Sequence, residues 1–283
     1  MRLKSLVLPA AALGTAAAMI VPAERTDAYS IIHSGLSTAQ RDFRVWNNFT
    51  DGAANNNQTP HPNFPGATGA VMALWKGHIE WQSMKHGDGT GDPTQGTGLG
   101  SGGANFDPSY QGLHNGTGGI NDNVISTISS CSGGTLAYTE SPGTNGWRVR
   151  FCENWTWDDG PGAIGFNNYD IQGVGCHEYG HALGLGHSGS LNATMYPSTS
   201  NGSESARSIE ADDINGVRAI YGTASSIKPT IEEVCVSGNQ MTVLGTNFTP
   251  TNNQVWFTRN STGTGQPVTV TGVPSANGTT LTV

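Results

Sequence analysis

The chain has 283 residues, of which 35% are hydrophobic and 12% are charged, and 40 are glycine. This composition is typical of a loop-rich, β-leaning protein with a largely neutral surface, and it contains too many apolar residues for a disordered chain. The formal net charge is −8, and no run of Lys or Arg follows the first few residues. We therefore do not expect the protein to bind nucleic acid.

Residues 1–28 have the composition of a secretory signal peptide. Arg2 and Lys4 form a positive start, residues 6–21 are apolar and Ala-rich, and small residues suited to cleavage follow, the last of them Ala28. The apolar stretch is short for a membrane span, although an uncleaved N-terminal anchor is the alternative. No later stretch approaches spanning length, so we expect a secreted protein without membrane contact after signal removal.

The next part of the chain is expected to contain strands, one helix and glycine-rich loops. Residues 41–46 alternate polar and apolar side chains, which predicts a strand. Residues 67–84 place apolar side chains at near-helical spacing, which predicts a long helix packed under a sheet. A turn-rich loop is expected at 51–65, and a long surface excursion at 87–119. Further strands are expected at residues 121–129, 134–139 and 147–151, followed by a loop at 160–175.

The chain has four cysteines, Cys131, Cys152, Cys176 and Cys235. Export permits disulfides, and three full pairings are possible. We favour a bond between Cys131 and Cys152 because they flank a predicted hairpin in one domain, whereas Cys176 lies in a predicted helix. The alternative is that all four are reduced and buried as small hydrophobic residues.

The sequence from His177 to His181 has the pattern H-E-x-x-H. Residues four apart on an α-helix lie one turn apart on the same face, so these two histidines can direct their imidazoles at one ion. Glu178 is rotated by about 100° on the same turn and can reach a water on the ion without ligating the metal. The alternative is a helix with satisfied surface histidines, and the further fixed positions described next argue against it.

Gly184 and Gly186 follow this pattern, and glycine suits chain reversal better than a helix interior. We expect the helix to end at Gly184, so that the backbone swings round and brings His187 back as a third ligand. Three histidines leave a fourth position open for water, which distinguishes a catalytic zinc site from a closed structural one. One catalytic Zn²⁺ is therefore the predicted cofactor.

The spacing His-Glu-x-x-His-x-x-Gly-x-x-His over residues 177–187, followed by Met195, resembles the metzincin metallopeptidases. The sequence of residues 188–197 resembles the matrixin branch of that group. The resemblance implies an α+β catalytic domain, here residues 29–223, with a twisted mixed sheet, three helices and zinc in an open cleft.

Residues 209–221 repeat apolar side chains at helical spacing, and Ser208 is the expected N-cap. In matrixins a helix of this kind, with an Asp-Asp pair like Asp212 and Asp213, closes the domain. The resemblance implies that one of the two aspartates supports the turn at Met195. A solvated helix face is the alternative for either aspartate alone.

The resemblance also implies roles for individual site residues. Glu178 is the general base that takes a proton from the attacking water and passes it to the leaving amine. Met195 lies beneath the zinc as an apolar floor, and Tyr196 and Pro197 form a wall of the pocket for the substrate side chain after the cut. A substrate peptide lies antiparallel along an edge strand, here expected at residues 134–139.

Further metal sites are less well supported by the sequence. Many matrixins bind a second, structural zinc, but the corresponding positions fall on Tyr138 and residues 150–152, which cannot supply it. Calcium is possible at the Asp/Gly loops 88–92 and 158–159, although ordinary turn residues are the favoured interpretation. The histidines without ligand spacing, to which no role is assigned, are His33, His61, His78, His86 and His114.

Residues 227–283 consist of short alternating stretches broken by Gly and Asn, which is typical of strands. The sequences P-T-I at 229–231 and T-V-L-G-T-N-F at 242–248 resemble the IPT/TIG module, which implies a small all-β immunoglobulin-like domain. Because the chain stops at Val283 within an expected strand, we expect this module to be incomplete.

These features favour a secreted zinc-dependent endopeptidase that acts on protein or peptide substrates. The main alternative is an extracellular binding or adhesion protein that uses the metzincin domain as a scaffold and the IPT/TIG-like module for recognition. Retention of Glu178 argues against it, because a scaffold has no need of a general base. A third hypothesis is a metal-dependent hydrolase with a non-peptide substrate. The sequence indicates neither a particular substrate nor an oligomeric state.

Overall fold

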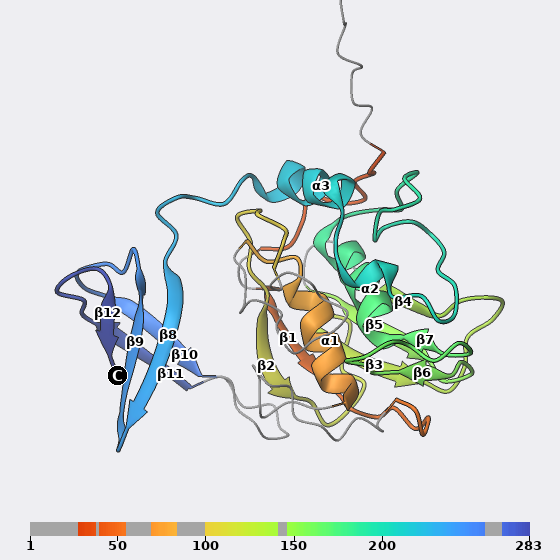
Figure 1. The fold of residues 1–283 in the computed structure, drawn as a ribbon, viewed down its shortest axis with the longest axis horizontal. Coiled ribbons are helices and arrows are strands. Elements are labelled where there is room, and N and C mark those ends of the chain that lie inside the picture. Colours follow the sequence, from red (N-terminus) through yellow and green to blue (C-terminus); the bar gives the residue numbers. More distant parts are fainter. Residues whose placement is uncertain (1–27, 38–39, 55–68, 84–99, 141–145, 258–267) are drawn as a thin grey trace, which may run out of the picture.

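A computed structural model of the chain describes residues 28–37, 40–54, 69–83, 100–140, 146–257 and 268–283. The predicted signal peptide, apart from Ala28, and the candidate calcium loop at 88–92 lie outside the described residues. Figure 1 shows a larger body of helices and strands and, after it in the chain, a small body made of strands only.

The larger body is built on a five-stranded mixed sheet with strand order β2-β1-β3-β5-β4. Its strands are β1 Asp42–Val45, β2 Ser109–Leu113, β3 Val124–Ile128, β4 Ala137–Glu140 and β5 Arg148–Cys152, and a separate short parallel ribbon joins β6 Trp157–Asp158 to β7 Tyr169–Asp170. β1 runs parallel to β2 and β3, β3 runs parallel to β5, and β4 runs antiparallel to β5. Among the described strands, β4 is therefore an edge strand with a partner on one side only.

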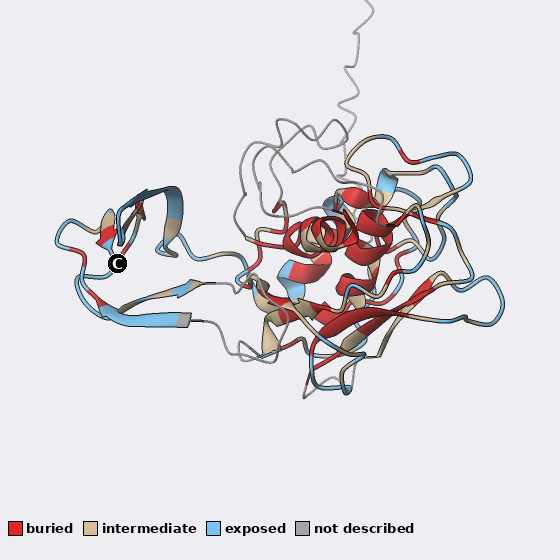
Figure 2. Ribbon diagram, turned by 90° about the horizontal axis from the view of Figure 1, so that it is seen from below, coloured by how far each residue is buried: buried red, intermediate tan, exposed pale blue. Residues whose placement is uncertain are grey.

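Two helices pack on this sheet, and a third follows them in the chain. They are α1 Gly69–Ile79, α2 Ile171–Leu183 and α3 Ala211–Tyr221. α1 packs against α2, and α2 packs on β4 and β5. The crossing is close at Gly77, where an added Cβ would lie 2.5 Å from the Gln172 carbonyl oxygen, so glycine is required. Figure 2 shows the core where helices meet the sheet, and its fully buried members include Phe43, Leu74, Ile125, Phe151 and Tyr179.

One expectation about the fold is wrong in part. β2 lies within residues 87–119, which we expected to form an irregular surface excursion. Its sequence, Ser-Tyr-Gln-Gly-Leu, has no clear alternation, and Gly112 has a φ of +90°. Local sequence therefore favours no strand here, and the strand state depends on parallel pairing with β1, which is distant in sequence.

The ends of all three helices also differ from the prediction. α2 begins at Ile171, inside the stretch 160–175 that was expected to be a loop, because the Asp170 carboxylate caps the helix there. α1 ends at Ile79, several residues before the expected position 84. α3 starts at Ala211 with Glu210 as N-cap instead of Ser208, because the Glu210 N–H donates to the Asp213 carboxylate at 2.9 Å. No helix in the described part of the chain is long and apolar enough to cross a membrane.

The predicted disulfide between Cys131 and Cys152 is present, with a Cα–Cα distance of 5.5 Å. It joins the turn before β4 to the last residue of β5, so it closes one end of the β4–β5 hairpin. Cys176 is buried in α2 and Cys235 is exposed, and both are free thiols.

The small body contains only strands and turns among its described residues, as the sequence predicts. An antiparallel sheet has the order β12-β9-β8, and β10 pairs antiparallel with β11; the strands are β8 Thr230–Ser237, β9 Gln240–Thr246, β10 Asn253–Phe257, β11 Val268–Val273 and β12 Thr280–Thr282. Its core is small and consists of Val243, Phe248, Val273 and Leu281. Lys228 pairs with Asp107 of the larger body at 2.5 Å.

Candidate metal centre and active-site cleft

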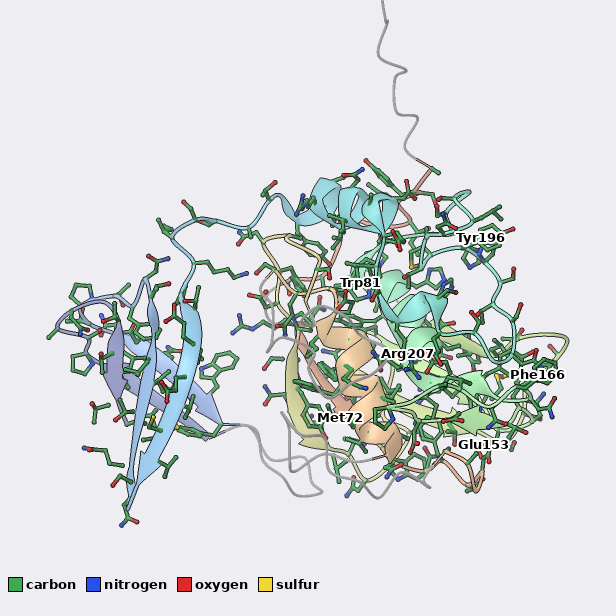
Figure 3. All side chains as sticks on the ribbon, viewed as in Figure 1. Met72, Trp81, Glu153, Phe166, Tyr196 and Arg207 are labelled. Atoms are coloured by element: carbon green, nitrogen blue, oxygen red, sulfur yellow. A yellow bond between two sulfur atoms is a disulfide. The ribbon has the colours of Figure 1, made fainter. Side chains whose placement is uncertain are left out.

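Helix α2 begins at a buried cap. The Asp170 carboxylate accepts hydrogen bonds from the Gln172 N–H at 3.2 Å and the Gly173 N–H at 3.0 Å. Arg207 also binds this carboxylate, in a buried ion pair of 2.7 Å, and Figure 3 shows Arg207 beside α2. These contacts satisfy Asp170 and fix where the helix starts relative to the loop that carries Arg207.

The helix ends at Gly184, as predicted, in a left-handed conformation with a φ of +109°. Its N–H donates to the His181 carbonyl oxygen, and an added Cβ would lie 2.8 Å from the His33 carbonyl oxygen. Glycine satisfies both the backbone angle and this close approach. The chain reverses here and returns toward the helix face that carries the first two histidines of the motif.

The reversal brings His187 to His177 and His181. One ligand atom from each of the three residues lies within 4.8 Å of the other two. The Nδ1 atom of His177 lies 2.7 Å from the Thr194 carbonyl oxygen, and that of His181 lies 2.8 Å from the Leu185 carbonyl oxygen. A carbonyl oxygen only accepts hydrogen bonds, so each Nδ1 carries the hydrogen and each Nε2 keeps its lone pair for a cation.

The protonation of these rings suits a metal ion. Burial, with a contribution from nearby His181, lowers the pKa of His177 to about 3, and burial also lowers the pKa of His181. Both imidazoles are therefore neutral near pH 7, which is the form that binds a metal. Three imidazoles with open space beside them fit one zinc ion of the catalytic type.

Glu178 lies next to the histidine triad and is only 5% exposed. Burial raises the pKa of its carboxyl group to about 7, and a hydrogen bond from the Thr139 hydroxyl acts in the opposite direction. The distance from Thr139 Oγ1 to Glu178 Oε2 is 2.7 Å. A carboxyl group with a raised pKa is suited to accept and release a proton near neutral pH.

The turn at Met195 is held by Asp213, one of the two aspartates for which this support was expected. The Asp213 carboxylate accepts hydrogen bonds from the Thr194 N–H at 2.7 Å and the Met195 N–H at 3.1 Å. Met195 is buried and packs directly against α2. A Cβ added at Gly180 of this helix would lie only 2.3 Å from the Met195 sulfur. Asp212 binds the Ser188 hydroxyl at 2.6 Å instead.

A cleft of about 700 Å³ runs past the triad. One side is formed by residues 134–139, which include most of edge strand β4, and the other side includes Tyr196 and Pro197. Figure 3 shows Tyr196 on the loop beyond α2. The structure therefore brings the predicted substrate strand and the two predicted pocket residues to the same cleft as the metal triad.

Residues at two other candidate cation sites form hydrogen bonds with protein groups. Arg150, in the region corresponding to the second zinc, directs its guanidinium to the Ser126 hydroxyl and the Gly118 carbonyl oxygen. Asp158, in a candidate calcium loop, accepts hydrogen bonds from the backbone N–H groups of Gly160 and Gly165. Arg150 therefore cross-links neighbouring segments, and the contacts of Asp158 are those of an ordinary turn.

Two contacts at the site were not anticipated from the sequence. They are the bond from Thr139 to Glu178 and the buried pair of Arg207 with Asp170. Period-two alternation along residues 134–139 could have indicated which face of the strand Thr139 shares, but its partner is 39 residues away. Nothing in the local sequence indicates that Arg207 is buried.

A mixed sheet, a helix with H-E-x-x-H and a third histidine beyond a glycine reversal together define a site of the zinc metallopeptidase class. Comparison with known proteins supports this class. Residues 126–222 match the Matrixin family (Peptidase_M10), and this segment contains the triad, Glu178 and the Met195 turn.

Named relatives are similar over about a third of the chain. The chain is 39% identical over 110 residues to interstitial collagenase of Equus caballus, covering 37% of this chain and 22% of that protein. It is 40% identical over 95 residues to matrilysin of Homo sapiens, covering 33% and 34% respectively. It is 39% identical over 99 residues to neutrophil collagenase of Homo sapiens, covering 34% and 20%. The chain thus spans between a fifth and a third of the length of these relatives.

Proposed function

We propose that the protein is a secreted zinc-dependent endopeptidase of the matrixin type. The observation that carries the proposal is the convergence of three histidine ligand atoms, all within 4.8 Å of one another, beside a buried glutamate in an open cleft. The similarity of this segment to collagenases and matrilysin supports hydrolysis of peptide bonds.

His177, His181 and His187 would hold the ion. Zinc bound there supplies a Lewis acid that polarises the substrate carbonyl and lowers the pKa of water to about 7. Glu178 accepts the proton of the attacking water as the carbon–oxygen bond forms, and then delivers it to the nitrogen of the leaving amine as the carbon–nitrogen bond breaks. Its burial keeps the proton affinity of the carboxylate high enough for both steps.

A substrate peptide binds along the free side of β4. An edge strand presents unpaired backbone N–H and C=O groups, which pair with an extended peptide by strand augmentation. β4 borders the cleft beside the triad, so a peptide paired with it passes the metal. Tyr196 and Pro197 on the opposite side contact the side chain after the cut.

Export and the role of the C-terminal body belong to the same proposal. A disulfide between Cys131 and Cys152 agrees with an oxidising compartment outside the cytosol. The two antiparallel sheets of residues 227–283 agree with an immunoglobulin-like IPT/TIG module attached to the peptidase domain.

Cleavage of a general protein substrate tests this function. The purified chain is expected to cleave casein or gelatin, to lose activity with a chelator and to regain it with zinc. Glu178→Ala is expected to retain zinc and to lose activity by at least about 100-fold, the scale of general acid–base catalysis. Undiminished cleavage by Glu178→Ala would exclude the assigned role, and cleavage of an ester substrate alone would favour a non-peptide hydrolase.

A further inference from the structure

We infer that Thr139 on edge strand β4 is a positioning residue that holds the Glu178 carboxylate for proton transfer. The inference rests on the proposed peptidase function and adds to it a residue outside the H-E-x-x-H motif. It is drawn from one side-chain contact, the geometry of the strand that carries it and the burial of the carboxylate.

The strand places the Thr139 side chain toward α2. Alternate residues of a strand face the same side, so Thr139 shares its face with Ala137, which is 8% exposed. The neighbouring residue Glu140 faces the other way and pairs with Arg148. Since α2 packs on β4, the Thr139 hydroxyl reaches the first turn of the metal motif.

The hydroxyl contacts two atoms of the same residue. Thr139 Oγ1 lies 2.7 Å from Glu178 Oε2 and 2.7 Å from the Glu178 backbone oxygen. A hydroxyl has one hydrogen, so it donates to one of these oxygens at a time. When the hydroxyl donates to Oε2, this hydrogen bond limits rotation of the Glu178 side chain.

This restraint leaves the other carboxylate oxygen for chemistry. In the part of the chain that the structure describes, no group donates a hydrogen bond to Oε1, and Glu178 lines the cleft. A carboxylate that is 5% exposed and loses its donor would turn toward water or another donor. Thr139 therefore keeps one oxygen occupied and the other directed to the cleft.

The same contact couples the general base to the substrate strand. β4 is the strand along which the peptide is proposed to pair, and Thr139 lies within it. A hydrogen bond from this strand to Glu178 fixes the distance between the bound peptide and the base. Removing it is expected to slow the chemical step while peptide binding along the backbone of β4 is retained.

Two substitutions at Thr139 test the inference in the full-length, zinc-loaded protein. Thr139→Val keeps the shape and removes the hydroxyl, and Thr139→Ser keeps the hydroxyl. We expect Thr139→Val to lower kcat by about tenfold or more, with KM changed by less than about twofold, because a hydrogen bond to a charged group is lost. We expect Thr139→Ser to recover kcat to within about threefold of wild type. Thr156→Val, the same change at an exposed threonine outside the cleft, is the matched control and is expected to leave both constants unchanged.

Crystal structures of the wild type and Thr139→Val give a readout independent of activity. The expected result is a displaced or multiply positioned Glu178 carboxylate in Thr139→Val, with zinc content and melting temperature unchanged. The inference is overturned by wild-type kcat in Thr139→Val, by equal losses in the Val and Ser variants, or by an unmoved carboxylate. If the wild type cleaves no peptide, the proposed function fails, while the carboxylate position still decides the role of Thr139.

Discussion

Two backbone carbonyl groups decide which nitrogen of His177 and of His181 faces the cleft. The Thr194 and Leu185 carbonyl oxygens accept from Nδ1 of His177 and His181, so the rings are oriented before any ion arrives. A residue's chemistry here depends on contacts made by its neighbours in space. The surroundings of His78 also decide its chemistry, but they make it a core residue and not part of the cleft.

His78 received no role from the sequence and lies fully buried in the core. Its ring stacks on Tyr179 at 4.4 Å and on Phe43 at 4.8 Å, and its Nδ1 contacts the Leu74 carbonyl oxygen at 2.8 Å. In the described part of the structure, its Nε2 has no hydrogen-bond partner. It therefore acts as a neutral aromatic core residue.

The pKa of His78 predicts how stability depends on pH. Burial lowers its pKa from 6.5 to about 3, so below pH 6.5 the unfolded chain binds a proton that the folded chain does not. The free energy of unfolding therefore falls as the pH falls from 6.5 toward 3. Between pH 7 and pH 5, wild type should lose about 2 kcal/mol more than His78→Phe, as measured by urea unfolding at both values. An equal pH dependence in the two proteins would contradict this assignment.

Helix α2 is the element that assembles the site, and its two ends are fixed by different means. At its start, Asp170 is held by two amides and by Arg207. At its end, Gly184 adopts a conformation that other residues adopt only with strain. The helix thus carries two of the three clustered histidines itself and positions the third through the reversal that follows.

Gly184→Ala should impair both folding and zinc binding. Alanine at this position would have to adopt a φ of +109°, and its Cβ would lie 2.8 Å from the His33 carbonyl oxygen. Backbone strain of this kind costs about 1–3 kcal/mol. We expect a lower melting temperature and weaker zinc affinity in a competition titration, because His187 is displaced. Gly133→Ala is the matched control: its φ is +65°, but nothing lies within 4 Å of the added Cβ. If both variants bind zinc equally well, the Gly184 reversal does not position the ligand.

At the scale of the whole molecule, the larger body is organised so that a free strand edge borders the metal cleft. The mixed sheet places β4 last in the strand order, and its hairpin with β5 is closed by the disulfide. The smaller body has its own core and pairs Lys228 with Asp107 of the larger body.

Removal of the disulfide tests how far the hairpin depends on it. The bond between Cys131 and Cys152 spans 21 residues, and closing a loop of that length stabilises a fold by about 3 kcal/mol in the chain-entropy account. The double replacement Cys131→Ala/Cys152→Ala should lose stability on this scale in denaturant unfolding while it retains zinc. Cys235→Ala, at an exposed free thiol, should leave stability unchanged. A stability loss below about 1 kcal/mol in the double variant would show that the hairpin is held by packing alone.

The sequence by itself determined the features that depend on local spacing. The placement of two histidines on one helix face, the glycine reversal after them and the pairing of two cysteines around a hairpin follow from short-range geometry. The periodic patterns also predicted α1 and most strands, and the histidine motif predicted α2. The resemblance to matrixins implied that one aspartate of the acidic pair supports the Met195 turn, and Asp213 does so.

Tertiary structure decided the features that join distant parts of the chain. β2 is a strand because β1 pairs with it, α3 starts where Asp213 bonds Glu210, and Glu178 meets Thr139 because α2 packs on β4. The free energy of these contacts comes from burial and from hydrogen bonds between residues far apart in sequence, which no local pattern records. The clustering of the three histidines was therefore readable in the sequence, whereas the contact of Thr139 with Glu178 was not.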